Sequence, residues 1–129
     1  MEFHYTKAFV TLAALDFDQL VQFYQKLLNQ KPNPYISSVY AEFQLKGLNL
    51  GIFKPKASHQ QEFANSFGSG MSLCLEVENI EDAIAHLTIM GYPPTGDLTL
   101  ASHGKEIYAY DPDGNRLILH QGLSKILNL

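Results

Sequence analysis

The sequence predicts an α+β fold built from two tandem modules, each with a strand, a helix and two or three further antiparallel strands. Two observations predict this fold. An alternating apolar segment at residues 9–16 recurs at residues 72–79, and each copy ends on a residue type that caps helices. Each copy is followed by apolar residues at helical spacing and then by two strand-like runs joined by a turn. We therefore expect one domain made of module 1, about residues 8–54, a linker, about 55–70, and module 2, about 71–121.

In the first module, the strand leads into a helix and then into a hairpin. Asp16 and Gln19 have the spacing of a helix N-cap and its reciprocal capping partner. The apolar residues at helical spacing are Leu20, Phe23, Tyr24, Leu27 and Leu28. Two antiparallel strands are expected next, at residues 39–45 and 48–53, because a Lys46-Gly47 turn separates them.

The second module repeats this order. Asn79 and Asp82 imitate the capping pair, and Gly91 is a natural C-terminal cap for the helix. The apolar residues on this helix are Ala83, Ile84, Leu87 and Met90. The strands expected after it are a short one near residues 99–102 and a pair at 105–110 and 116–121, with the turn Asp111-Pro112-Asp113-Gly114-Asn115 inside the pair.

Composition and charge argue against several classes of partner. The 129 residues contain nine basic and thirteen acidic side chains, for a net charge of −4, so we expect no nucleic-acid partner. No apolar run approaches the roughly 20 residues that a membrane span needs, so we expect no membrane partner. Residues 1–7 lack the basic-then-apolar order of a signal peptide, and the single cysteine, Cys74, excludes an internal disulfide. These features predict a small, soluble, cytoplasmic domain.

Several short sequence pieces carry a resemblance to a known family. They are Val10-x-Leu12-x-x-x-Asp16, Phe23-Tyr24-x-Lys26-Leu27-Leu28, Leu73-x-Leu75-x-Val77-x-Asn79, Gly91-Tyr92 and residues 110–118. Over residues 8–121 the chain resembles the vicinal oxygen chelate superfamily, which includes glyoxalase I, extradiol dioxygenases, fosfomycin-resistance enzymes and bleomycin-binding proteins. The resemblance implies paired βαβββ modules, whose mixed sheets curl around a shared cavity, and a homodimer.

The resemblance also implies a divalent metal ion held by inward-facing side chains, usually His, Glu or Gln. The corresponding positions in this chain are Phe9, Gly51, Ser72 and Ile118. Phenylalanine, glycine and isoleucine side chains offer no donor lone pair, and a neutral serine hydroxyl is a poor ligand. We therefore expect no metal ion at this place, and we expect no other cofactor.

Histidines could form a metal site elsewhere in the chain. They are His4, His59, His86, His103 and His120. No two of them have the spacing that places two ligands on one face of a helix or strand. The first four are expected to be solvated or hydrogen-bonded surface imidazoles. His120 shares the strand parity of Ile118 and should face the cavity, and whether it contacts a ligand stays open.

Strand parity selects the side chains that should line the cavity. Apolar rows such as Val10 and Leu12 should pack on the helices, and the alternate rows should face inward. The expected ligand-binding residues are Phe9, Thr11, Asn49, Gly51, Phe53, Ser72, Cys74, Arg116, Ile118 and His120. The two modules give contradictory parity for residues 40–45 and 105–110. The sequence therefore does not decide whether Tyr108 and Tyr110 line the cavity or pack on the core.

Charged and reactive groups among these residues allow more than one interpretation. Glu76 and Arg116 have two equally supported interpretations: their charges contact a ligand, or they lie at the rim of the cavity and face solvent. Cys74 is expected to be a small buried residue and not a nucleophile, because no neighbouring base is evident. The two carboxylates of the turn at residues 111–115 are explained by turn geometry, so no residue is assigned to catalysis.

A largely apolar, aromatic cavity with a few polar groups is typical of sites for small, flat organic molecules. The leading hypothesis is a metal-independent protein that binds a small hydrophobic or aromatic molecule and resembles the bleomycin-resistance branch. The net charge of −4 is only mildly suited to the cationic drug of that branch. The alternative is a lyase, isomerase or dioxygenase of the same superfamily, with an unusual metal site or with His120 as a metal-free acid or base. A third hypothesis is a structural or regulatory dimer with a vestigial cavity.

Overall fold

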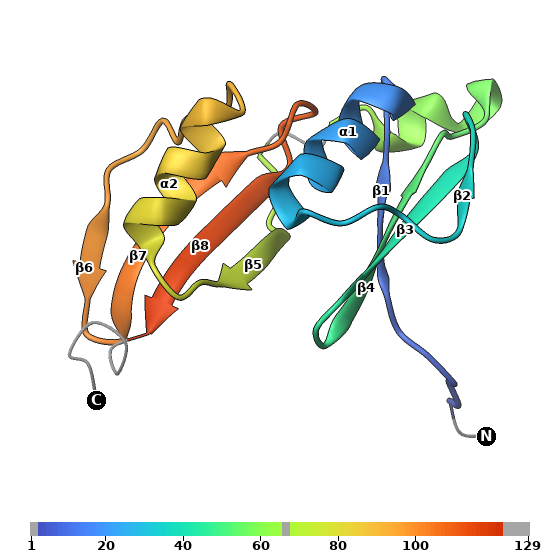
Figure 1. Ribbon diagram of the computed structural model, residues 1–129. Helices are drawn as coiled ribbons and strands as arrows, with labels where there is room; N and C mark the ends of the chain where they lie inside the picture. Colours follow the sequence, from blue (N-terminus) through green and yellow to red (C-terminus); the bar gives the residue numbers. More distant parts are fainter. Residues whose placement is uncertain (1–2, 66–67, 123–129) are drawn as a thin grey trace. The chain divides into compact units, whose positions relative to one another are not determined.

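Two four-stranded mixed sheets, each covered on one face by an α-helix, form the described part of the chain, so the predicted α+β fold is confirmed (Figure 1). The computed structural model describes residues 3–65 and 68–122. The chain divides into two units at the boundary between Phe63 and Ala64. Each sheet pairs its first and last strands in parallel and its other neighbours antiparallel. Among the described residues, no helix has both the length and the apolar composition needed to cross a bilayer.

Unit 1 contains the first helix and the first sheet. Its elements are β1 (Val10–Ala13), α1 (Phe17–Leu28), β2 (Tyr35–Ile36), β3 (Tyr40–Leu45), β4 (Leu48–Phe53) and a 3-10 helix, η1 (Ala57–Phe63). The strand order in the sheet is β1-β4-β3-β2. The strand expected at residues 48–53 is confirmed in full. The sequence prediction lacks β2, because a strand of two residues has no alternating pattern, and lacks η1, which lies in the expected linker.

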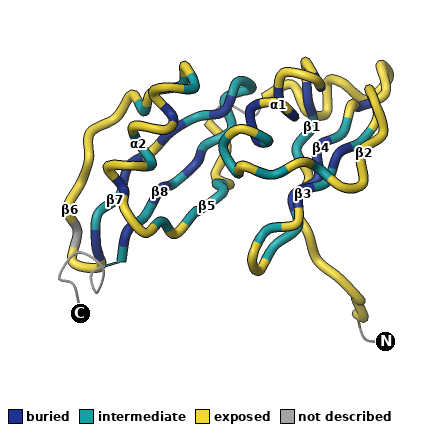
Figure 2. Tube along the Cα trace, in the orientation of Figure 1, coloured by how far each residue is buried: buried dark blue, intermediate teal, exposed yellow. Residues whose placement is uncertain are grey.

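The core of unit 1 lies between α1 and the sheet. Leu20 and Tyr24 of α1 are fully buried, as are Leu50 and Ile52 of β4 (Figure 2). The helix begins as predicted, because the Asp16 carboxylate accepts a hydrogen bond of 3.1 Å from the backbone N–H three residues later. Burial of these apolar side chains therefore fixes which face of the sheet the helix covers.

Unit 2 contains the second helix and the second sheet. Its elements are β5 (Ser72–Glu76), α2 (Ile80–Ile89), β6 (Thr99–Ala101), β7 (Gly104–Tyr110) and β8 (Arg116–Gly122). The strand order is β5-β8-β7-β6, which repeats the order of unit 1. Helix α2 ends at the predicted place: Gly91 has φ of +94°, and the N–H of Tyr92 donates to the carbonyl of Leu87.

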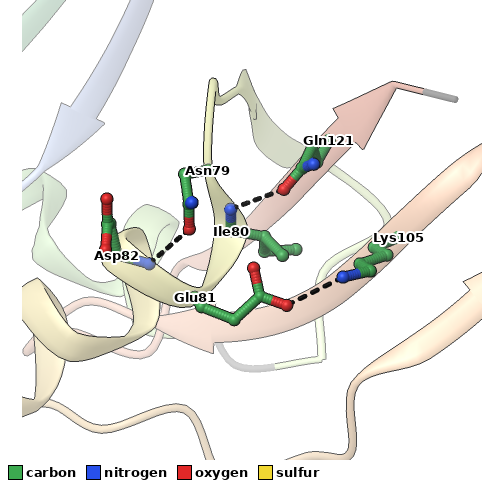
Figure 3. A network of polar contacts seen from close by, with 6 residues as sticks. All are labelled: Asn79, Ile80, Glu81, Asp82, Lys105 and Gln121. Carbon is green, nitrogen blue, oxygen red and sulfur yellow. Dashed lines mark hydrogen bonds and ion pairs between the residues drawn. The ribbon is translucent and has the colours of Figure 1, made fainter. Parts of the chain in front are cut away.

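Polar side chains join the start of α2 to the sheet (Figure 3). The Asn79 side chain accepts a hydrogen bond of 2.9 Å from the Asp82 N–H, which confirms the predicted cap. The buried Gln121 side chain accepts a bond of 2.7 Å from the Ile80 N–H. On the surface, the Lys105 ammonium donates to the Glu81 carboxylate at 2.8 Å and lowers the pKa of that carboxyl. A buried contact from β8 and an exposed contact from β7 thus hold the first turn of the helix.

Replacing Gln121 with methionine keeps the length of the side chain but leaves the Ile80 N–H without its partner. We expect the free energy of unfolding to fall by about 1–3 kcal/mol, because an unsatisfied buried donor loses hydration without gaining a bond. Urea denaturation measures this loss. The control, Lys105→Met, removes only an exposed ion pair and should cost much less. Equal losses in the two variants would contradict this account of the helix start.

Candidate functional site

In unit 1, the face of the sheet that α1 leaves uncovered carries a polar group of side chains. The register pairs Thr11 with Gly51 and Gly51 with Glu42. Tyr40 pairs with Phe53 on the same face. The alternate residues of these strands face the core. The β4 partners of Val10 and Leu12 are Leu50 and Ile52, which are fully buried. The face of β3, which the sequence left open, is thereby settled.

Tyr40, Glu42 and Asn49 form a hydrogen-bonded cluster on this face. The Tyr40 hydroxyl donates to Glu42 Oε1 at 2.8 Å, and Asn49 Nδ2 donates to Glu42 Oε2 at 3.5 Å. The tyrosine ring lies against Gly51, where a Cβ atom would be 2.7 Å from the Tyr40 hydroxyl oxygen. The missing side chain of Gly51 is therefore what gives the Tyr40 ring its place.

The environment of Tyr40 keeps its hydroxyl protonated. Burial, the hydrogen bond to Glu42 and the charge of that carboxylate together raise the pKa of Tyr40 from 10.0 to about 12, and burial is the largest of the three causes. At neutral pH the group is consequently a hydrogen-bond donor and not a base.

The aromatic side chains of the same region are partly exposed. Phe53 and Phe63 meet edge to face, with ring centroids 5.3 Å apart. Phe63 is 42% exposed and Phe9 is 49% exposed. Partly exposed rings beside an oriented polar cluster can bind a flat molecule by stacking and hydrogen bonding together.

In unit 2, the register arranges the uncovered face of the sheet in three rows. Along β5, β8 and β7 the rows are Ser72–Arg116–Tyr110, Cys74–Ile118–Tyr108 and Glu76–His120–Glu106. The middle row is apolar, and its Tyr108 ring is 46% exposed. Both tyrosines of β7 therefore share the face of Ile118. Cys74 is exposed and not buried as predicted, because α2 covers the opposite face of β5.

Arg116 is engaged at one end of this face. Its guanidinium donates to the Ser69 carbonyl at 2.9 Å and to the Ser72 hydroxyl at 3.0 Å. A lone pair of the Ser72 oxygen is thus directed at a cation. In the adjoining turn, the buried Asp111 carboxylate accepts bonds from the N–H groups of Asp113 and Asn115, which is the structural role that its position predicts.

His120 lies at the other end of the face with two partners. Its Nδ1 is 2.5 Å from the Glu76 carboxylate, and its Nε2 is 2.8 Å from Nδ1 of His103. The two imidazole rings stack, with centroids 4.9 Å apart. The sequence spacing of histidines did not indicate this pair, because the two rings come from a turn and from a strand far along the chain. His103 is thus an exposed, hydrogen-bonded imidazole, as expected, but the sequence did not predict that His120 is its partner.

The positions where the family resemblance implies a metal do not fit one. Gly51 has no ligand atom, and the Tyr40 ring fills the adjacent space. The Phe9 ring faces the Lys7 ammonium at 5.9 Å, and the Ser72 hydroxyl faces a guanidinium. Ile118 lies in an apolar row. Hydrocarbon side chains and adjacent cations both disfavour a divalent ion at these positions.

A separate groove of about 390 Å³ lies on the other side of unit 1, between α1 and the segment that follows it. Val21 and Gln25 line it from the helix, and Pro32 and Tyr35 line it from the segment. None of the predicted ligand-binding residues is part of it. Sequence parity could not have indicated it, because α1 and the segment at residues 31–35 line it, and the sequence predicts no strand there.

Comparisons with known proteins agree with this fold. Residues 6–119 match the model of the glyoxalase/bleomycin resistance protein/dioxygenase superfamily. No curated protein matches the chain. Similar solved structures include a bleomycin resistance determinant encoded on the transposon Tn5, with 21% identity, a TM-score of 0.65 and coverage of 92% of this chain and 99% of that one.

Two further structures are similar. The fosfomycin resistance protein FosX from Listeria monocytogenes has 20% identity, a TM-score of 0.71 and coverage of 98% of both chains. A glyoxalase-related enzyme from Fulvimarina pelagi has 18% identity and a TM-score of 0.72, with coverage of 92% of this chain and 89% of that one. At these identities the likeness concerns the fold.

The Tyr40 cluster makes a prediction for alkaline pH. Tyr40 should ionise near pH 12 in an ultraviolet titration, and Tyr40→Phe should remove that step. Glu42→Gln should lower the pKa of Tyr40 because it removes a negative charge beside the hydroxyl. The unfolded chain releases this proton near pH 10 and the folded chain near 12, so the free energy of unfolding should fall as pH rises through that window. An unchanged titration curve for Tyr40→Phe would contradict the cluster.

Proposed function

Since the chain belongs to the glyoxalase/bleomycin resistance protein/dioxygenase superfamily, we propose that it binds a small hydrophobic or aromatic molecule on the uncovered faces of its sheets. The proposal needs no metal ion at Phe9, Gly51, Ser72 or Ile118. By analogy with the bleomycin-resistance branch, the ligand is held without chemical change. A cytoplasmic protein with this property would lower the free concentration of its ligand.

One observation carries the proposal: in unit 1 an oriented polar cluster lies beside exposed aromatic rings. The Tyr40 hydroxyl and Asn49 amide share the Glu42 carboxylate, and edge-on Phe53 and Phe63 offer apolar surface. Glu42 favours ligands that carry a hydrogen-bond donor or a positive charge next to an aromatic ring, because it is an anionic acceptor. In unit 2, Ile118 and Tyr108 supply a second apolar surface of the same kind.

A second candidate function is acid–base catalysis without a metal. It is favoured by the Glu76–His120 pair, in which a carboxylate 2.5 Å from Nδ1 orients the imidazole, so that a proton would be exchanged at Nε2 in place of its hydrogen bond to His103. Turnover of a bound molecule that is lost in Glu76→Gln, with binding retained, would favour this function over simple binding.

A homodimer is part of the proposal. Large apolar side chains with high exposure, such as Met71 at 71% and Leu100 at 72%, support burial against a second copy. Light scattering of the purified chain should give twice the mass of 14.5 kDa. A mass of one chain at micromolar concentration would overturn this part alone.

The variant Gly51→Trp tests the binding site. Gly51 has ordinary backbone angles and its close neighbour is the end of a flexible tyrosine side chain, so the fold should tolerate the indole, which should occupy the space beside Glu42. We expect a compound that raises the melting temperature of the wild type to lose most of that effect in the variant. The compounds to test are bleomycin and flat aromatic amines and amides.

The matched control is Gln22→Trp, which places the same indole in the groove beside α1. It should leave the ligand-induced rise in melting temperature unchanged. Loss of the rise in the control but not in Gly51→Trp would move the site to that groove and overturn the proposal. The absence of any stabilising compound in the panel would also count against it.

A further inference from the structure

Two imidazoles and a carboxylate meet at one end of the uncovered face in unit 2. His103 lies in the β6–β7 turn, Glu106 in β7 and His120 in β8, and one ligand atom from each lies within 4.8 Å of the others. We propose that these three residues bind a divalent first-row transition metal ion. The inference goes beyond the proposed function, because it concerns a different ligand and different side chains from the Tyr40 cluster.

The residue types suit such an ion. Two histidine nitrogens and one carboxylate oxygen are a common protein ligand set for catalytic Zn²⁺ and for non-haem Fe²⁺. Three protein ligands leave at least one coordination position for water or for a substrate atom. The site lies two residues along β8 from Ile118, so it is separate from the position where the family resemblance implies a metal.

The backbone brings the three side chains together. Glu106 and His120 are direct partners in the antiparallel register, so their side chains leave the same face as neighbours. His103 reaches them because the turn closes tightly at Gly104. That glycine has φ of +140°, and a Cβ there would lie 2.1 Å from the carbonyl oxygen of Gln121. A side chain at residue 104 would therefore push the turn, and His103 with it, away from β8.

The two imidazoles need to move only slightly apart to bind a metal ion. Nδ1 of His103 and Nε2 of His120 are 2.8 Å apart, the distance of a hydrogen bond. A tetrahedral zinc ion with Zn–N bonds of about 2.0–2.1 Å holds two nitrogens about 3.3 Å apart. The rings must therefore separate by about half an ångström. His103 can supply this movement, because it is an exposed residue of a turn.

Glu76 supports His120 from the side away from the other ligands. Its carboxylate contacts Nδ1 at 2.5 Å, so the proton of a neutral imidazole lies on Nδ1 and the lone pair lies on Nε2, toward His103. The second nitrogen of a metal-binding histidine usually donates to a carboxylate, a backbone carbonyl or water, and here it contacts a carboxylate. This contact distinguishes the cluster from a chance group of surface side chains.

The charges around the cluster favour a cation. Glu76 and Glu106 are the two carboxylates of the His120 row. The adjacent Lys105 has the opposite parity, and its ammonium is bound to Glu81 of α2. Arg116 belongs to the row at the other end of the face, so its positive charge does not lie in the His120 row.

The test is binding of Zn²⁺ alone to the chain, purified without a histidine tag and treated with a chelator. Competition with a chromophoric chelator gives the stoichiometry and the affinity. We expect one Zn²⁺ per chain, weakened about tenfold or more by His103→Ala and by Glu106→Gln. Glu76→Gln, which removes no ligand, should weaken it by about 10–100-fold.

The matched control is His59→Ala, which removes an exposed histidine of η1 and should leave the affinity unchanged. Proton NMR of the imidazoles gives an independent readout: one equivalent of Zn²⁺ should shift the resonances of His103 and His120 only. Wild-type affinity equal to that of His103→Ala, or shifts spread over all histidines, would overturn the proposal. Either result would leave the Gly51→Trp experiment unaffected, because that experiment uses no metal.

Discussion

The parallel pairing of the first and last strands of each sheet is the constraint on which the rest of the structure depends. Side chains alternate along a strand, so the register between β5 and β8 decides which rows meet α2 and which stay uncovered. A shift by one residue would exchange Leu117 and Leu119 for Ile118 and His120 beneath the helix. The bond from the Ile80 N–H to Gln121 ties the helix to the correct row.

Local signals predicted most of the fold. The caps at Asp16 and Asn79 and the strand at residues 48–53 depend on neighbouring residues, and the structure confirms them. The candidate sites depend on register between distant strands, which one sequence does not determine. Glu42 and Glu106 were therefore missed as site residues, since the parity of their strands was contradictory. His103 was missed because its partner lies seventeen residues away, across a hairpin.

The two units use the same face of the same kind of sheet for different chemistry. In unit 1, the acidic group of Glu42 is occupied by neutral donors, Tyr40 and Asn49, and aromatic rings lie beside it. In unit 2, Glu76 instead orients the imidazole of His120, and the other ring nitrogen of that imidazole contacts His103. A repeated architecture thus keeps its core and changes what its uncovered strand positions do.

Gly51 also has an evolutionary consequence. A single-base change in a glycine codon can encode aspartate or glutamate, and either would bring a carboxylate to a strand position where the family resemblance implies a metal ligand. The Tyr40 hydroxyl, 2.7 Å from where that Cβ would lie, would have to leave first. Gaining a carboxylate at residue 51 therefore also requires the Tyr40 side chain to move away, at the expense of its hydrogen bond to Glu42.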